Sequence, residues 1–350
     1  DAIIEDLKWL GYTPTNIFYG SDYFDATYEE AIKLIKKGLA YVDDLSQEEM
    51  SRMRDTNNGA GIPSPYRDRS VEENLALFEQ MREGKFKDGE KTLRAKIDMS
   101  SPNINMRDPV IYRIIHNTHH RQGDKWCIYP MYDFAHPLQD AFEGVTHSLC
   151  SIEYDNHRPL YDWVVEHCEV KSHPHQYEFG RLNIANTVLS KRYLRALVDA
   201  EKVTGYDDCR MPTLVGLRRK GFTADSIKNF ILSTGLSRIN STVDFSFLEN
   251  FLRDDLKLEV SRPNAVINPL RVTITNYPEG QIEYLDCPNN QENEEMGSRK
   301  IAFSRHLYIE RDDFMTEKPN KKWKRLSKQN NLSVRHMVLN QRKLLYDFHY

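Results

Sequence analysis

The first 90 residues place apolar positions at the spacing of amphipathic helices, and hydroxyl residues mark where those helices begin. Thr27, Ser46 and Ser70 each stand three positions before a glutamate. This spacing is the sequence pattern of a helix-capping box. We therefore expect helices to begin near these three residues, the first of them ending at Gly38.

The apolar period shortens to two after Lys91, where alternation over residues 93–97 predicts a strand. The apolar and aromatic run KWCIYPMY at 125–132 predicts a buried strand, and residues 138–144 predict a short helix. The first half of the chain therefore combines helices and strands, as expected for an α/β fold.

Residues 182–260 return to a mostly helical pattern. Thr223 can cap a helix that stops at Gly235, and Thr242 can cap the next one. After Pro263 the pattern favours strands: residues 270–276 alternate, and PEG at 278–280 predicts a turn before another strand. The chain is thus mixed α/β, then helical, then rich in strands.

Composition narrows the class of protein. The 350 residues are 39% hydrophobic and 29% charged, which is enough apolar material for two or three domains. No apolar run approaches the ~18 residues of a membrane-spanning helix. The net charge of −4 excludes a uniformly basic nucleic-acid binder, although residues 318–343 carry nine Lys or Arg and no acid. Five scattered cysteines without a CxxC pair fit a reducing cytoplasm better than a disulfide framework.

The segment VLSKRYL at 188–194 is a candidate for phosphate chemistry. A flexible lysine such as Lys191 can place its charge on a phosphoryl oxygen in a transition state. Taken alone, so short a motif is more typical of an ordinary surface loop.

Residues 127–154 concentrate polar side chains directly after the predicted buried strand. A strand followed by a polar loop and helix is how open α/β sheets build ligand pockets. Two other readings stay open from these residues alone. One is a buried strand with satisfied polar neighbours, and the other is a metal site built from His136, Asp140, Glu143 and His147.

Long segments of the chain resemble the glutaminyl-tRNA synthetases, a family of class I aminoacyl-tRNA synthetases. The matching stretches lie in the expected order and cover nearly the whole chain: SPYRDRSVEENLALFEQMREG, LRAKIDM, MRDPVIYRI, KWCIYPMYDFAHPLQDAFEGVTHSLC, HQYEFGRLN, VLSKRYL and DDCRMPTLVGLRRKGF. VLSKR is similar to the KMSKS loop of class I enzymes, with Leu189 in place of the usual Met.

The resemblance implies an α/β fold: the C-terminal half of a class I Rossmann-type catalytic domain, an α/β insertion, a helical subdomain and the start of a β-barrel. The implied domains are the end of the first Rossmann half (1–20), the acceptor-stem-binding insertion (21–131), the second Rossmann half (132–190), the helical subdomain (191–260) and an incomplete proximal anticodon-binding barrel (261–350). The HIGH motif of class I enzymes does not occur in the chain. We therefore expect a fragment that is inactive by itself.

The resemblance also assigns roles to matching positions. Those implied to bind glutamine are Tyr132, His136, Ser148, Cys150 and Gln176. Those implied to bind ATP are Ser151, Arg181, Leu182, Leu189, Ser190 and Lys191, with Lys191 as the catalytic charge. Arg262 matches a position that reads the anticodon, and Asn156 departs from an acid that touches the acceptor stem in many members. Mg²⁺ is expected with ATP, and no metal site of the protein itself.

The implied activity is the ATP-dependent activation of glutamine and its transfer to the 3′ end of tRNA(Gln). The protein is expected to be a cytoplasmic monomer with no membrane partner. Two alternatives stay open: a glutamyl-tRNA synthetase of the eukaryote-like branch, and a non-catalytic tRNA-binding derivative. Residues 133–150 contain no Lys or Arg to pair with a substrate carboxylate, which favours glutamine over glutamate.

Overall fold

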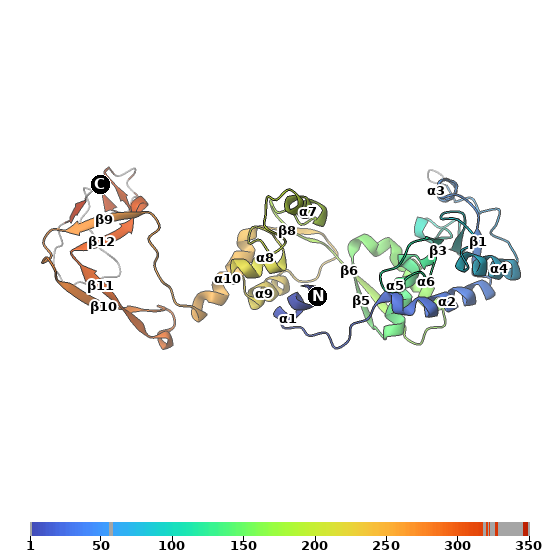
Figure 1. The fold of residues 1–350 in the computed structure, drawn as a ribbon, viewed down its shortest axis with the longest axis horizontal. Helices are drawn as coiled ribbons and strands as arrows, with labels where there is room; N and C mark the ends of the chain where they lie inside the picture. The colour runs from blue at the N-terminus through green and yellow to red at the C-terminus, as the bar shows by residue number, and fades with distance from the viewer. Residues whose placement is uncertain are drawn as a thin grey trace. The chain divides into compact units, whose positions relative to one another are not determined.

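The computed structural model describes residues 2–55, 59–317, 320, 322, 326–327 and 346–348. The chain divides into two compact units (Figure 1). The first comprises Asp1–Ala224 and Phe230–Phe245, and the second comprises Asp225–Asn229 and Ser246–Tyr350. In the described part of the chain, no helix is both long and apolar enough to cross a membrane.

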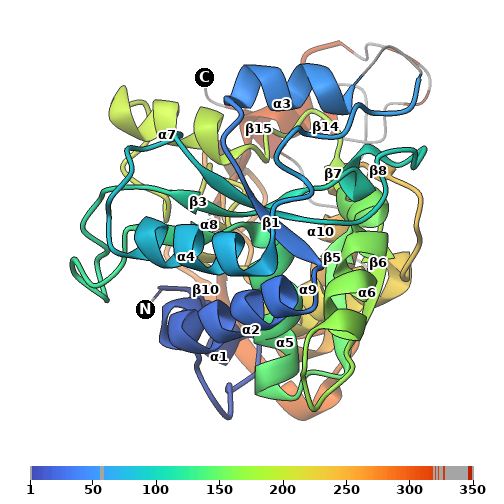
Figure 2. The same ribbon diagram turned by 90° about the vertical axis from the view of Figure 1, so that its right-hand side faces the viewer.

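The first unit contains a four-stranded antiparallel sheet. Its strands β1 to β4 lie in sequence order and comprise Ala40–Asp43, Thr92–Ala95, Val110–Ile114 and Ile128–Pro130. Helices α2 (Phe24–Lys36) and α4 (Val71–Arg82) pack against β1 and against each other (Figure 2). Their apolar faces bury Leu34 and Phe78 in one core cluster with Val42. The strand predicted near residue 93 is β2, and all four of its residues are buried.

Two of the three predicted helix starts are confirmed. Ser46 caps α3 (Gln47–Arg54) in a complete capping box, and Ser70 caps α4. The prediction for Thr27 is wrong, because this residue is buried inside α2. The 3-10 turn Gly20–Tyr23 leads directly into α2, so the helix starts one turn earlier than the spacing suggests.

A parallel pair of strands forms the second α/β part of the first unit. These are β5 (His147–Ser151) and β6 (His175–Phe179), connected by the 3-10 turn η3 (Ile152–His157) and by α6 (Arg158–His167). Helix α5 (Tyr132–Glu143) precedes β5 and packs against α6 (Figure 1). It starts six residues before the predicted helix at Leu138. Pro137 lies inside it, and an interior proline is disfavoured in helices, so the pattern places the start too late.

Residues 182–260 are largely helical, as predicted, and extend from the first unit into the second. Their first three helices are α7 (Lys191–Asp199), α8 (Leu214–Lys220) and α9 (Ala224–Thr234), and a further helix, α1 (Ala2–Trp9), lies in the first unit. Two short parallel strands, β7 (Leu182–Ile184) and β8 (Ser241–Val243), pair with each other, and α7, α8 and α9 lie between them in the sequence. Thr242 therefore lies in a strand, and its predicted role as a helix cap is wrong. The helix α10 (Phe245–Glu259) begins after β8, because residues 241–243 pair with β7 instead of coiling.

Strands dominate the second unit. They are β9 to β15, comprising Pro269–Ile274, Ile282–Pro288, Ser298–Ser304, His306–Glu310, Phe314–Met315, Leu326–Ser327 and Tyr346–Phe348. The turn predicted at 278–280 is confirmed, and Gly280 adopts the positive φ of +77° that a side chain would resist. The strands on either side of this turn pair elsewhere, β9 with β12 and β15, and β10 with β11. The basic stretch 318–343 lies largely outside the described residues, and a closed barrel stays a prediction.

Candidate functional site

The five residues expected to bind glutamine meet on one face of the β5–β6 pair. Ser148 and Cys150 are buried on β5, and Gln176 is buried on β6 directly opposite Ser148. Tyr132 and His136 approach this face from α5, where His136 Nε2 lies 3.3 Å from Ser148 Oγ. Side chains two apart on a strand share a face, which explains this convergence.

These five residues form the expected glutamine pocket, and Asp140 organises its helix side. Its Oδ2 lies 3.1 Å from His136 Nε2 and accepts a 2.8 Å hydrogen bond from the Tyr161 hydroxyl. Burial acts to raise the pKa of Asp140, but hydrogen bonds from His136, Ser148 and Tyr161 outweigh it and hold that pKa below its usual value. Asp140 is therefore a charged residue at neutral pH.

Aromatic rings surround Tyr132 at the α5 end of this group. Tyr132 is half exposed, and its ring lies 5.1 Å from the His136 ring and 5.3 Å from that of Tyr154. Burial raises the pKa of the Tyr132 hydroxyl, so the group stays neutral and can donate or accept a hydrogen bond.

A second buried carboxylate, Glu178, lies two residues beyond Gln176 on the same face of β6. It accepts a hydrogen bond from Gln176 Nε2 at 3.3 Å. Its other oxygen lies 3.4 Å from Arg158 Nη1 and 3.9 Å from Arg238 Nη2. Arg238 also pairs with Asp155. The two arginines beside the pocket are therefore already engaged by carboxylates.

The pKa of the Cys150 thiol is raised by its surroundings. Burial raises its pKa, and the negative charges of Glu178 and Asp140 raise it further. The same two carboxylates would also destabilise the negative charge of a carboxylate bound beside Cys150.

The residues expected to bind ATP lie on three elements. Ser151 ends β5. The pair Arg181 and Leu182 leads into β7, and the Arg181 amide donates to Asn240 Oδ1 at 2.7 Å. Residues Leu189–Lys191 enter α7, with Ser190 as the N-cap residue and Lys191 exposed at the first helical position. Their contact with ATP stays a prediction.

Arg262 lies in the second unit, after α10. Its guanidinium is 3.5 Å from Glu292 Oε1 and donates to the Lys257 carbonyl at 2.9 Å. Both partners of the Arg262 side chain therefore belong to the second unit. In the first unit, the Asn156 carbonyl accepts hydrogen bonds from Asn103 and Asn105.

The alternative metal site is not assembled. His136 pairs with Asp140, whereas Glu143 accepts a hydrogen bond from Gln139 and His147 contacts Thr146. Within the described ranges, no group of three or more His, Cys, Asp or Glu is arranged to hold a metal ion.

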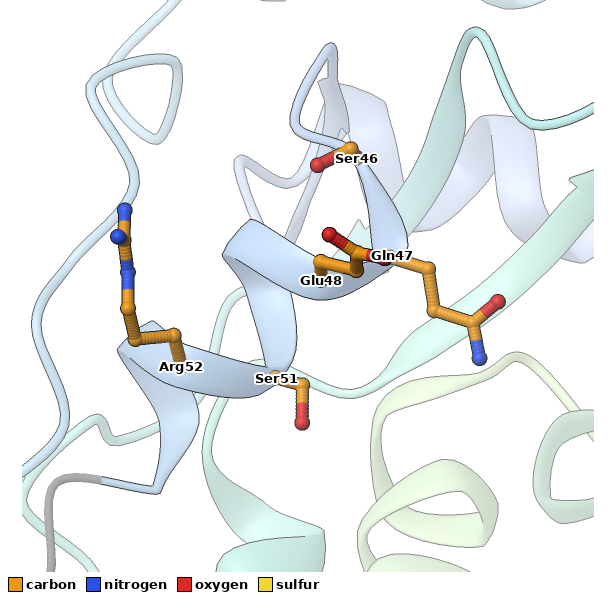
Figure 3. Close-up of a pocket in the computed structure, with 5 residues that line it drawn as sticks. All are labelled: Ser46, Gln47, Glu48, Ser51 and Arg52. Carbon is orange, nitrogen blue, oxygen red and sulfur yellow. The ribbon is translucent and has the colours of Figure 1, made fainter.

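Two hollows are lined by other residues. Figure 3 shows a pocket at α3 that is lined by Ser46, Gln47, Glu48, Ser51 and Arg52. A cavity of about 120 Å³ lies against α2, β4 and α5, with Phe24 and Tyr129 among its lining residues. Neither hollow contains a residue expected to bind glutamine or ATP.

Comparison with known families decides the identity. Residues 1–258 match the catalytic domain of the class I tRNA synthetases (E and Q), those for glutamate and glutamine. Residues 260–346 match the anti-codon binding domain of the same class. The chain belongs to this synthetase family. The resemblance expected from the sequence is thereby confirmed, as is a mixed α/β catalytic domain followed by an anticodon-binding domain.

The chain can also be compared with individual members of the family. The glutamine–tRNA ligases of Clostridium perfringens and Clostridium kluyveri are 59% and 58% identical over 326 residues, which is 93% of this chain. That of Clostridioides difficile is 57% identical over 323 residues. The chain spans 58–59% of the length of these relatives. Among solved structures, the glutamate–tRNA synthetase of Elizabethkingia anophelis shares the fold, with a TM-score of 0.50 at 15% identity over 74% of this chain and 60% of that one.

For the glutamine pocket, the sequence did not indicate several polar residues that the structure places beside the expected glutamine-binding residues: Asp140, Tyr161, Glu178, Arg158 and Arg238. One signal was present for Glu178. In HQYEF, the glutamine and the glutamate stand two positions apart and must share a face if the segment is a strand. Arg238 had no such signal, because it lies 60 residues from Glu178 and reaches it only in the folded chain.

Proposed function

We propose that the protein carrying this chain is a glutamine–tRNA ligase. It activates glutamine with ATP and transfers the glutaminyl group to the 3′ end of tRNA(Gln). The observation that carries the proposal is the 57–59% identity to three glutamine–tRNA ligases over 92–93% of the chain.

The charge of the pocket supports glutamine as the substrate. Asp140 and Glu178 line it as carboxylates, and the neighbouring Arg158 and Arg238 are engaged by Glu178. A glutamate side chain would enter beside two like charges, whereas an amide can donate to one group and accept from another. Burying a carboxylate without a cationic partner costs several kcal/mol.

The chemistry of the proposed reaction is positioning and charge stabilisation. The glutamine carboxylate attacks the α-phosphate of ATP, the bond to the β-phosphate breaks, and pyrophosphate leaves. A Mg²⁺ ion bound with ATP would share the charge of the phosphates. A ribose hydroxyl of the terminal tRNA adenosine then attacks the acyl carbon, and AMP leaves. Lys191 stabilises the charge that develops in the first step. No protein nucleophile is required.

The remaining roles follow the predicted division of the chain. Ser151, Arg181, Leu182, Leu189 and Ser190 hold ATP, and the segment 21–131 holds the acceptor end of the tRNA. Residues 261–350, with Arg262, contact the anticodon. The protein works as a monomer in the cytoplasm, and residues 1–350 by themselves catalyse no measurable pyrophosphate exchange.

Amino-acid-dependent pyrophosphate exchange by the full-length protein, with tRNA present, tests the function. We expect kcat/KM for glutamine to exceed that for glutamate by at least about a hundredfold, or ~2.7 kcal/mol. Equal use of both amino acids, or a preference for glutamate, would assign the protein to the glutamyl branch. No exchange with either, together with retained tRNA binding, would indicate a non-catalytic derivative.

A further inference from the structure

The orientation of the Gln176 side chain is determined by its neighbour on β6. Gln176 and Glu178 are both buried, 3% and 8% exposed, and the Gln176 amide nitrogen lies 3.3 Å from Glu178 Oε1. A carboxylate accepts hydrogen bonds and has none to donate. Only the NH₂ end of the Gln176 amide can therefore face Glu178, and the amide oxygen is turned away from it.

Glu178 is itself held from two sides. Arg158 reaches it from the first position of α6, and Arg238 reaches it from the loop that precedes β8. Arg238 is anchored a second time by its ion pair with Asp155. The second oxygen of the carboxylate is thereby occupied, which leaves Oε1 for Gln176.

The loop that carries Arg238 is packed tightly against the end of β6. The Gly180 amide donates to the Ser237 carbonyl at 2.5 Å, and the Arg181 amide donates to Asn240 Oδ1. A Cβ atom at Gly180 would collide with the backbone carbonyl of Ile239, so this approach requires glycine. The position of the Arg238 backbone is thus determined by β6 itself.

We propose that Glu178 is a positioning residue for substrate choice: it fixes the Gln176 amide so that its oxygen, and not its NH₂ group, is presented to the substrate side chain. This inference rests on the proposed function. An amide oxygen accepts from the NH₂ group of glutamine and repels the carboxylate of glutamate. Glu178 therefore acts on specificity through Gln176, without touching the substrate.

Removing the charge of Glu178 alters the pocket in two ways with the same consequence. The Gln176 amide can rotate and offer its NH₂ group to a carboxylate. Arg158 and Arg238 also lose their shared partner, and their positive charge becomes available to the pocket. Both changes favour glutamate, and neither removes the hydrogen bond between Arg181 and Asn240.

The test measures kcat/KM for glutamine and for glutamate in the full-length protein, with tRNA present, for wild type and Glu178→Gln. We expect the preference for glutamine to fall at least tenfold, with the KM for ATP within twofold of wild type. The matched control is Glu153→Gln, which removes the same charge from an exposed position on η3, and which we expect to keep the wild-type preference.

Arg238→Gln provides a second variant that is expected to fold, since Arg238 is 59% exposed. It loosens the hold on Glu178 without removing it, and we expect a two- to fivefold loss of preference. If folded Glu178→Gln, or Arg238→Gln where the first variant does not fold, keeps the wild-type preference, the inference is wrong while the proposed function stands. A wild-type protein that does not activate glutamine would instead refute the proposed function.

Discussion

Three side chains, those of His136, Ser148 and Tyr161, act on the carboxylate of Asp140. These partners hold its pKa in the folded protein below that in the unfolded chain. A lowered folded pKa adds stability that is present above the unfolded pKa, about 3.8, and is lost as the pH falls through the folded value. The contribution of Asp140 to the free energy of unfolding is therefore expected to be lost at acid pH.

Asp140→Asn removes this contribution. We expect the free energy of unfolding to fall by about 1–3 kcal/mol at pH 7, because charged hydrogen bonds are lost in a buried place. The difference from wild type should shrink below about pH 4, as measured by urea unfolding across the pH range. Glu143→Gln on the same helix is the control, with a change within about 0.5 kcal/mol. A difference that does not depend on pH would contradict the argument.

Lys191 is the residue that we propose to stabilise the charge that develops when glutamine is activated. It is exposed at the first position of α7, and its proposed role is to place its positive charge on the departing pyrophosphate. We expect Lys191→Ala to slow adenylate formation about a hundredfold or more, with little change in glutamine affinity. Pre-steady-state activation by the full-length protein measures this. The control is Lys202→Ala, another exposed lysine, and a wild-type activation rate in Lys191→Ala would exclude the role.

At the scale of elements, the antiparallel sheet depends on a buried ion pair between neighbouring strands. Arg94 on β2 lies 2.7 Å from Asp43 on β1, and the two side chains are 1% and 0% exposed. The Arg94 guanidinium also donates to the Asp108 carbonyl. The pair connects β1, β2 and the start of β3 in a region with no access to water.

Arg94→Met should leave the Asp43 charge buried without its partner. We expect a loss of about 3–5 kcal/mol in the free energy of unfolding, measured by urea denaturation. Lys96→Met is the matched control, because it breaks an ion pair with the 86% exposed Asp68, for which about 0–1 kcal/mol is typical. Similar losses in the two variants would show that burial does not set the strength of the Arg94 pair.

For the whole molecule, the two family matches divide the chain near residue 259, at the end of α10, whereas the longer segment of the second compact unit already begins at Ser246. Arg262 begins the anticodon-binding match and is held by Glu292 and the Lys257 carbonyl. Because these contacts lie within the second unit, a change at Arg262 is expected to affect tRNA binding and to leave the glutamine pocket intact.

Arg262→Gln should therefore weaken the binding of tRNA(Gln) by about tenfold, as expected when one arginine contact to a base is lost. Binding measured at a fixed salt concentration tests this, with thermal unfolding as the check on folding. Arg253→Gln removes an arginine of α10 that pairs with Glu249, and it serves as the control. Equal affinity in wild type and Arg262→Gln would remove this residue from the tRNA-binding surface.

The sequence by itself determined the family and the helix starts at Ser46 and Ser70. These depend on residues close together in the chain, where a motif or a cap is complete within a few positions. It also named the five glutamine-pocket candidates through family resemblance, without showing how they meet. That meeting depends on the register of β5 and β6, which pairs Ser148 with Gln176.

Only the tertiary structure decided what depends on distant partners. Thr27 has the spacing of a cap, yet the preceding turn and the core place it inside α2. Thr242 has the same local character, yet pairing with β7 makes it part of a strand. The arginine partners Arg238 of Glu178 and Arg94 of Asp43 lie more than fifty residues away and reach these carboxylates only after the chain has folded. Local patterns specify the caps at Ser46 and Ser70, whereas the ion pairs of Glu178 and Asp43 depend on contacts between distant parts of the chain.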